Sequence, residues 1–131
     1  MTKMQKRWEF WWKVVSLICL AWLKGIKVMP ISFYRTAEEQ NARYQQGRTK
    51  SGKIITNCDG YKNKSKHQDW LATDLAIPTS DWKDFIWVMT DEYRKLGELA
   101  QHIGLEWGHE WYEEGKTSFD DVWHFQYRDE S

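Results

Sequence analysis

Several features that would assign a chain to a class are scarce or absent in this sequence. Its 19 basic and 19 acidic side chains balance, so it lacks the overall basic excess of a nucleic-acid-binding protein, and we expect no nucleic acid partner. Two cysteines, Cys19 and Cys58, are too few for a disulfide scaffold and form no CxxC or Cys/His zinc pattern, which leaves a single disulfide open. No HExxH motif occurs, so a metal site would have to combine separated residues.

Long hydrophobic runs are also missing. The apolar stretch 14–23 follows a basic start, as in a signal peptide, but no A-x-A-like cleavage site follows it. The stretch is shorter than the roughly 20 apolar residues that span a bilayer, so we expect no stable membrane insertion. Its large apolar side chains recur every three or four positions, which predicts an N-terminal amphipathic helix within residues 1–25 that packs on the domain. The face predicted to be buried comprises Trp8, Trp11, Trp12, Val15, Ile18, Cys19 and Trp22.

The length of 131 residues suits a single domain spanning 1–131. Capping residues, glycines and hydrophobic periodicity predict helices at about 6–24, 37–46 and 91–103, and strands at 26–34, 53–56, 70–77 and 122–127. Thr36 and Glu39 form a capping box at the start of the second helix. Helices and strands are mixed without a regular βαβ period, so we expect a small α+β domain with about three helices.

Ten tryptophans are present, an unusual number for this length. Most are expected to fill the core, because large aromatic side chains provide much of the buried area of a small domain. For Trp107 and Trp111 two interpretations stay open, packing beside the last strand or forming a wall of a substrate groove.

Three polar side chains lie where a partner is required. Asp74 interrupts the apolar stretch 71–77, and His124 lies between Trp123 and Phe125. A carboxylate in an apolar strand is costly unless it is solvated, paired or bound to a metal. Together with His67, these residues offer two imidazoles and one carboxylate, a ligand set that suits a catalytic zinc with one open position. A satisfied structural histidine and a capping aspartate remain the alternatives.

The intervals between these residues restrict the geometry. His67 and Asp74 are seven positions apart, so on one regular strand they would point to opposite faces. They can meet only if His67 lies in the loop before the strand or a bulge intervenes. Asp121 and His124 are three apart, so Asp121 is expected in the turn that enters the last strand. An ordinary solvated acidic turn at Asp120 and Asp121 is the alternative.

Four blocks in the same order resemble the zinc D-Ala-D-Ala carboxypeptidases and VanY-type peptidases, which include L-alanyl-D-glutamate endopeptidases used as phage endolysins. The matching residues are Tyr34-Arg35-Thr36 with Gln40, Tyr44 and Gly47-Arg48-Thr49; Ser65, His67, Ala72 and Asp74; Gly104, Trp107, Gly108 and Trp111; and Asp121, His124 and Phe125. The resemblance covers about residues 26–127. It implies the hedgehog/DD-peptidase fold, in which an antiparallel sheet carries one zinc ion.

The resemblance also implies roles for individual residues. His67, Asp74 and His124 match the zinc ligands, and Asp121 matches the acid/base carboxylate, for which Glu110 is the rival. The remaining assignments are Arg35 facing the substrate carbonyl, and Ser65, Trp107, His109 and Trp111 as substrate contacts. The sequence departs from the family pattern at Trp70, where many members have glycine, at His109, and at Gln126, where a carboxylate is usual.

The expected function is zinc-dependent hydrolysis of a peptidoglycan stem-peptide bond of the L-Ala-D-Glu type, by a monomeric phage endolysin in host lysis. Such an enzyme would be made in the host cytoplasm and would act on the periplasmic wall after release. Two alternatives are a D-Ala-D-Ala carboxypeptidase or dipeptidase of cell-wall metabolism, and a non-enzymatic zinc domain of the hedgehog type. The intact Asp121 beside a complete ligand set favours an enzyme.

Overall fold

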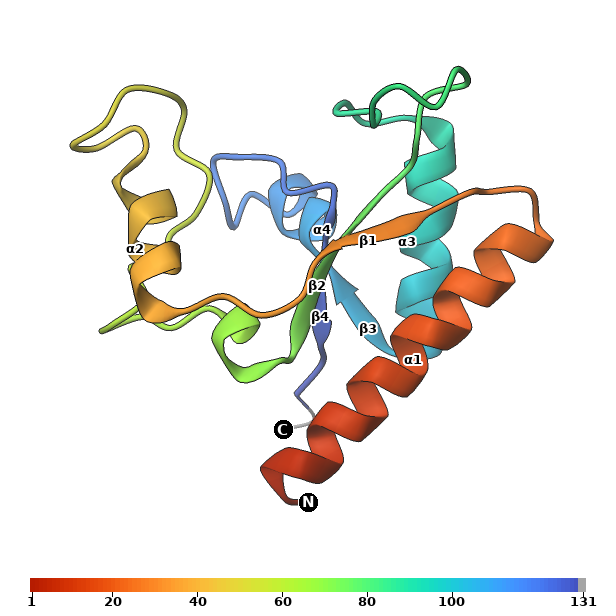
Figure 1. Cartoon of the computed structure of the whole chain (residues 1–131), viewed down its shortest axis with the longest axis horizontal. Helices are drawn as coiled ribbons and strands as arrows, with labels where there is room; N and C mark the ends of the chain where they lie inside the picture. Colours follow the sequence, from red (N-terminus) through yellow and green to blue (C-terminus); the bar gives the residue numbers. More distant parts are fainter. Residues whose placement is uncertain (130–131) are drawn as a thin grey trace.

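The computed structural model describes residues 1–129 as a mixed helical and sheet domain (Figure 1). The elements are α1 (Lys3–Leu23), β1 (Met29–Ser32), α2 (Ala37–Gln45), the 3-10 helix η1 (Lys66–Asp69), β2 (Ala72–Ala76), α3 (Asp91–Ile103), β3 (Leu105–Trp107), α4 (Gly108–Glu113) and β4 (His124–Tyr127). The four strands form one antiparallel sheet in the order β1-β2-β4-β3. The expected α+β class is therefore confirmed.

Side-chain caps begin the three longer helices. The Thr36 capping box at α2 forms as expected, Thr90 caps α3 by accepting the Tyr93 backbone N–H (3.3 Å), and Gly104 ends α3 in the left-handed conformation at φ +103°. Helix α1 begins earlier than expected, because Thr2 and Gln5 form a second capping box. Within residues 1–129, no helix combines the length and the apolar character that a membrane span requires.

The two faces of the sheet have different surroundings. On β2, Leu75 points to the hydrophobic core with Phe125 of β4, whereas Asp74 and His124 point to the other face. Helices α1 and α3 lie together on the core side, and α2 and η1 lie on the opposite side (Figure 1). The polar face is therefore the one that holds the candidate site.

Helix α1 packs mainly through a different face from the expected one, although Trp11 and Ile18 of the expected face are partly buried against the core. Its buried residues are Phe10, Val14, Leu17 and Ala21, whereas Trp8 and Trp12 leave 75% and 70% of their surfaces exposed. Cys19, expected to be buried, is also exposed, and neither cysteine is in a disulfide. The physical reason is that α1 has two apolar stripes with helical spacing. The stripe that contains the smaller Val14 and Ala21 is the one against the core.

Several short elements differ from the expectations. Strand β1 is shorter than the predicted 26–34. It lies at the sheet edge with a register irregularity between Pro30 and Ser32, which is where a proline is tolerated in a sheet. Residues 53–56 form no strand. Strand β3 and helix α4 were not predicted, because elements of three and six residues contain too little periodicity to be recognised.

Candidate metal centre

His67 is held by a single turn of helix. Ser65 caps η1 by accepting a hydrogen bond from the His67 backbone N–H (3.3 Å), and the Gln68 side chain accepts one in return from the Ser65 N–H (2.9 Å). The turn lies immediately before β2, so His67 approaches the sheet from a loop. This is the arrangement that the seven-residue interval to Asp74 required.

Asp74 and His124 are direct partners on neighbouring antiparallel strands. Facing residues on such strands place their side chains on the same face, about 5 Å apart at Cβ. Asp121 lies just before β4, and its carbonyl accepts the His124 backbone N–H (3.2 Å). The expectation that Asp121 lies in the segment entering the last strand is confirmed.

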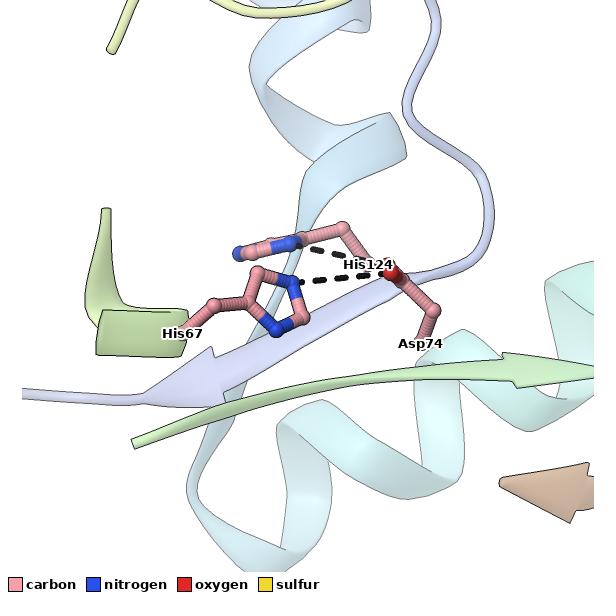
Figure 2. Close-up of side chains that lie close together, drawn as sticks. All are labelled: His67, Asp74 and His124. Atoms are coloured by element: carbon pink, nitrogen blue, oxygen red, sulfur yellow. Dashed lines mark ion pairs between the residues drawn. The ribbon is translucent and has the colours of Figure 1, made fainter. Parts of the chain in front are cut away.

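The three predicted ligands converge on one point (Figure 2). His67 Nε2 lies 3.5 Å from Asp74 Oδ2, and His124 Nδ1 lies 3.8 Å from Asp74 Oδ1. One donor atom from each residue lies within 4.8 Å of the other two, a spacing that a single metal ion can bridge. The side chains of His67 and Asp74 are 2% and 15% exposed, so the cluster is largely removed from solvent.

The outward nitrogen of each imidazole has its own partner. His67 Nδ1 lies 3.4 Å from the Phe33 carbonyl, which can accept its proton. His124 Nε2 lies 2.8 Å from Gln126 Oε1, and the Gln126 amide donates to Glu106. Both contacts favour the neutral tautomer that leaves an inner lone pair facing Asp74. Outer partners of this kind fix ligand orientation at metal sites.

Two more side chains hold Asp74 in place. The Ser32 hydroxyl donates to Asp74 Oδ2 (2.7 Å), and Arg35 Nη2 lies 3.5 Å from the same oxygen. Burial raises the pKa of Asp74, but its interactions with His67 and His124, the Ser32 hydrogen bond and the charge of Arg35 together keep it below its ordinary value. Asp74 is therefore an anion at neutral pH. Ser32 was not identified from the sequence, because only the β1–β2 register places it there.

The Asp121 side chain lies beside the cluster, with Oδ2 3.9 Å from His124 Nδ1. Burial raises the pKa of Asp121 to about 6, against the attraction of His124, and the negative charge of Asp74 raises it further. A carboxyl group with a pKa near neutrality can both accept and release a proton under physiological conditions. Glu110, the rival base, instead accepts a hydrogen bond from Gln101 (2.6 Å).

Arg35 is fixed at the wall of the site. Its Nη1 donates to the buried Gln40 side chain (2.8 Å), which in turn donates to Thr56 and to the Cys58 carbonyl. Burial lowers the pKa of Arg35, as does nearby Arg43, while Asp74 opposes the shift. Gln40 was recognised only as part of the family pattern. Its position shows that it orients the guanidinium.

An open cleft of about 430 Å³ lies over the cluster. Ser65, Trp111 and Asp121 line it together with the three candidate ligands and Arg35. The Trp111 ring lies 5.4 Å from that of His124, at the wall where a substrate contact was expected. Ser65 lies at the cleft, but its hydroxyl oxygen caps η1, so in this structure it positions His67.

Two of the expected substrate contacts lie elsewhere. Trp107 is only 2% exposed, packs in the core and donates its indole N–H to the Val122 carbonyl (2.8 Å). His109 is also buried, with Nδ1 2.6 Å from Asp120 and Nε2 3.1 Å from Glu113. Neither lines the cleft. Helix α4 was not predicted from the sequence, so the side chains of this segment that face the core could not be told apart from those that face the cleft.

Trp70, the departure from the family's glycine, adopts the left-handed conformation at φ 62°. Such a conformation costs a non-glycine residue roughly 1–2 kcal/mol. The ring stacks on Tyr34 at 5.1 Å, and the Trp70 carbonyl accepts the Trp11 indole N–H (2.9 Å). These contacts offset the strain and explain how the turn after His67 persists without glycine.

Comparisons with known proteins agree with this geometry. The family model described as VanY, D-alanyl-D-alanine carboxypeptidase, matches residues 3–130. Peptidoglycan L-alanyl-D-glutamate endopeptidase CwlK of Bacillus subtilis (strain 168) is 35% identical over 96 residues, which are 67% of this chain and 56% of that protein. The chain thus spans a little over half the length of this curated relative.

Solved structures share the fold. The LD-carboxypeptidase LdcB superposes with a TM-score of 0.63 at 18% identity, covering 91% of this chain and 57% of LdcB. The vancomycin resistance D,D-pentapeptidase VanY from a VanB-type cassette was solved with Zn(II). It superposes with a TM-score of 0.57 at 20% identity, covering 88% of this chain and 68% of that one. At these identities the likeness establishes the fold alone. With the family model matching nearly the whole chain, the protein belongs to the VanY D-alanyl-D-alanine carboxypeptidase family.

Proposed function

We propose that this chain is a zinc-dependent peptidoglycan peptidase that hydrolyses the L-Ala-D-Glu bond of the stem peptide. The observation that carries the proposal is the convergence of His67, Asp74 and His124 beside Asp121 at the floor of an open cleft. The choice of bond is supported by the 35% identity to an L-alanyl-D-glutamate endopeptidase. Both the reaction and the bond go beyond what fold similarity establishes.

The donor chemistry fits zinc. Two neutral imidazoles and one carboxylate are ligands that zinc prefers, and three protein ligands leave a position for water and substrate. Burial lowers the pKa of His67 to about 3, although Asp74 opposes the shift, so this imidazole keeps its lone pair at neutral pH. When bound, the ion would supply Lewis acidity, polarising the scissile carbonyl and making water more acidic.

Asp121 would transfer the proton. As the carboxylate, it accepts a proton from the water whose oxygen attacks the carbonyl carbon, and it then delivers that proton to the amine released when the C–N bond breaks. Its pKa of about 6 leaves most of the group ionised at pH 7, ready to accept, while keeping the acid strong enough to release. Its position at the cleft surface, 27% exposed, gives it access to water.

Arg35 would stabilise the negative charge that develops on the carbonyl oxygen. Its guanidinium lines the cleft and is held by Gln40, so it does not have to reorganise during the reaction. Preorganised donors of this kind typically contribute a few kcal/mol to transition-state stabilisation. The Arg35 backbone N–H also donates to the His67 carbonyl (3.2 Å), which ties the arginine to the metal-ligand turn.

The charge around the cleft suits an anionic peptide. Arg43, Lys64, Lys66 and Lys116 line it, whereas its acidic residues, Asp74 and Asp121, are at the metal cluster. Stem peptides contain free carboxylates, including that of D-Glu when it is linked through its side chain. Basic side chains at the rim would therefore concentrate and orient this substrate.

We further propose that the protein acts as a monomeric phage endolysin, made in the host cytoplasm and reaching the periplasmic wall after release. The sequence blocks shared with phage endopeptidases support this role. D-Ala-D-Ala carboxypeptidase or dipeptidase activity is the second candidate, favoured by the description of the family model.

Product identification separates these candidates. Purified protein would be incubated with defined pentapeptide muropeptides, with and without a chelator, and the products analysed by mass spectrometry. The proposal expects cleavage between L-Ala and D-Glu, which exposes a new amino group on D-Glu, and loss of cleavage after zinc removal. Release of terminal D-Ala instead would establish the carboxypeptidase alternative, and chelator-resistant cleavage would refute the zinc mechanism.

A further inference from the structure

The outer face of α1 is an apolar stripe exposed to solvent. Its members recur at helical spacing and are well exposed: Met4, Trp8, Trp12, Val15, Trp22 and Leu23. Four of them, with Arg7 and Trp11, line a shallow groove of about 400 Å³. This stripe is separate from the core-facing stripe of the same helix. Monomeric soluble proteins rarely expose contiguous apolar surface of this kind without a use for it.

The neighbouring edge strand extends the exposed surface. Met29 and Phe33 leave 44% and 47% of their surfaces exposed, whereas the exposed Ile31 lines a pocket beside Asp74 and Asp121. The Trp11 ring stacks on Phe33 at 5.5 Å, and the Trp22 indole N–H donates to the Val28 carbonyl (3.0 Å). These contacts join α1 to the β1 segment. The apolar surface therefore spans two elements and has a rigid support.

Charge is distributed unevenly along the chain. Residues 1–27 contain six of the 19 basic side chains but only one of the 19 acidic ones, Glu9. The remaining residues therefore contain 13 basic and 18 acidic side chains. The balanced net charge therefore hides a basic N-terminal helix on a mildly acidic domain. Five of the six basic residues lie at or just beyond the two ends of α1: Lys3, Lys6 and Arg7, then Lys24 and Lys27. The sixth, Lys13, pairs with Glu9 in the middle of the helix (3.1 Å), and Lys3 also pairs with Asp69 (2.9 Å).

We propose that the exposed stripe of α1 docks the protein on the surface of an anionic lipid bilayer, with the helix lying in the plane of the interface. Tryptophan combines a large apolar ring with one polar N–H, which suits the boundary between acyl chains and headgroups. Basic side chains at both ends would meet anionic headgroups, each contributing attraction that falls off with salt.

A second copy of the chain fits the surface less well. Self-association through this face would bring two basic helices together, each with an excess of five positive side chains over negative ones, and like charges oppose such an approach. A lipid surface of opposite charge removes that repulsion. The pattern of large aromatic residues with flanking lysine and arginine is that of helices that lie on membranes.

Vesicle flotation tests the proposal. The parent chain is expected to float with phosphatidylethanolamine vesicles containing phosphatidylglycerol, to float less at high salt, and to stay unbound with phosphatidylcholine vesicles. The double variant Trp8→Ser, Trp12→Ser should bind the anionic vesicles at least about tenfold more weakly, since two large apolar side chains no longer enter the interface. Tyr61→Ser, which changes a 61% exposed aromatic residue outside α1, is the matched control and should bind like the parent.

Thermal unfolding followed by circular dichroism should give similar midpoints for all three proteins, because neither tryptophan packs in the core. Absence of binding by the parent, or equal binding by the parent and the double variant, would overturn the proposal. Light scattering without vesicles tests whether a second copy of the chain covers this surface instead of a lipid bilayer. A parent dimer that the double variant converts to a monomer would also overturn it, in favour of a second copy.

Discussion

Once metal is removed by a chelator, His67 and Asp121 are expected to respond to acid in opposite directions. Burial lowers the pKa of His67 to about 3, so between pH 6.5 and 3 the unfolded chain binds a proton there that the folded chain does not. Burial raises the pKa of Asp121 from 3.8 to about 6, so between those values the folded chain binds the extra proton. Acid therefore destabilises the fold through His67 and stabilises it through Asp121.

The magnitudes follow from these pKa values. From pH 7 to 5, proton uptake by unfolded His67 removes about 2 kcal/mol of stability, at roughly 1.4 kcal/mol per pH unit below 6.5. Protonation of Asp121 in the folded chain adds about 1.3 kcal/mol of stability over the same range. The free energy of unfolding of the parent should therefore fall by about 1 kcal/mol or less between pH 7 and pH 5. Asp121→Asn, which removes the compensating group, should lose about 2 kcal/mol.

Urea denaturation of chelator-treated protein at pH 7 and pH 5 measures both values. The double variant His67→Gln, Asp121→Asn is the control, because it removes both groups and reports the pH dependence of the rest of the chain. Its loss of stability between the two pH values should be smaller than that of Asp121→Asn. If the parent and Asp121→Asn lost the same amount, the opposing effects assigned to the two groups would be wrong.

Three further substitutions test the supporting structure. Gly97→Ala would place a methyl group 2.2 Å from the Trp107 ring, and urea denaturation should show a loss of about 1–3 kcal/mol or more. Gln126→Leu removes the partner of His124 Nε2, and competition with a chelating dye should show zinc affinity reduced about 10–100-fold, whereas unchanged affinity would exclude an orienting role. Gly108→Ala would place a methyl group 2.4 Å from the Asp121 carbonyl oxygen and 3.2 Å from the His124 Cβ, which forces the segment that enters β4 to shift. Zinc content by elemental analysis should therefore fall, and full zinc occupancy would count against this close packing.

The sequence could predict the metal cluster because its chemistry is local. Asp74 and His124 are polar residues in apolar strands, and the interval to His67 required a loop-borne ligand, which η1 provides. Ser32 could not be predicted as a partner of Asp74, because the pairing depends on a register that includes an irregularity in β1. Such cross-strand detail is set by the folded sheet.

The face of α1 could not be chosen from periodicity either. Both Phe10 with Val14 and Trp8 with Trp12 follow helical spacing, and hydrophobicity favoured the stripe with the tryptophans. The core selects by shape, and the smaller side chains allow α1 to lie close to α3 and the sheet. For Trp107 the sequence left core packing and a cleft wall open as alternatives, and the structure shows core packing beside β4.

Turnover by Asp121→Ala at full zinc occupancy tests the central claim most directly. Zinc per chain and the rate of muropeptide cleavage would be measured on the same preparations of parent and variant. We expect one zinc ion in each, since Asp121 is not among the three ligands, with cleavage by the variant reduced about 10²–10⁴-fold. Full activity in the zinc-loaded variant would contradict the assignment of Asp121 as the group that transfers the proton.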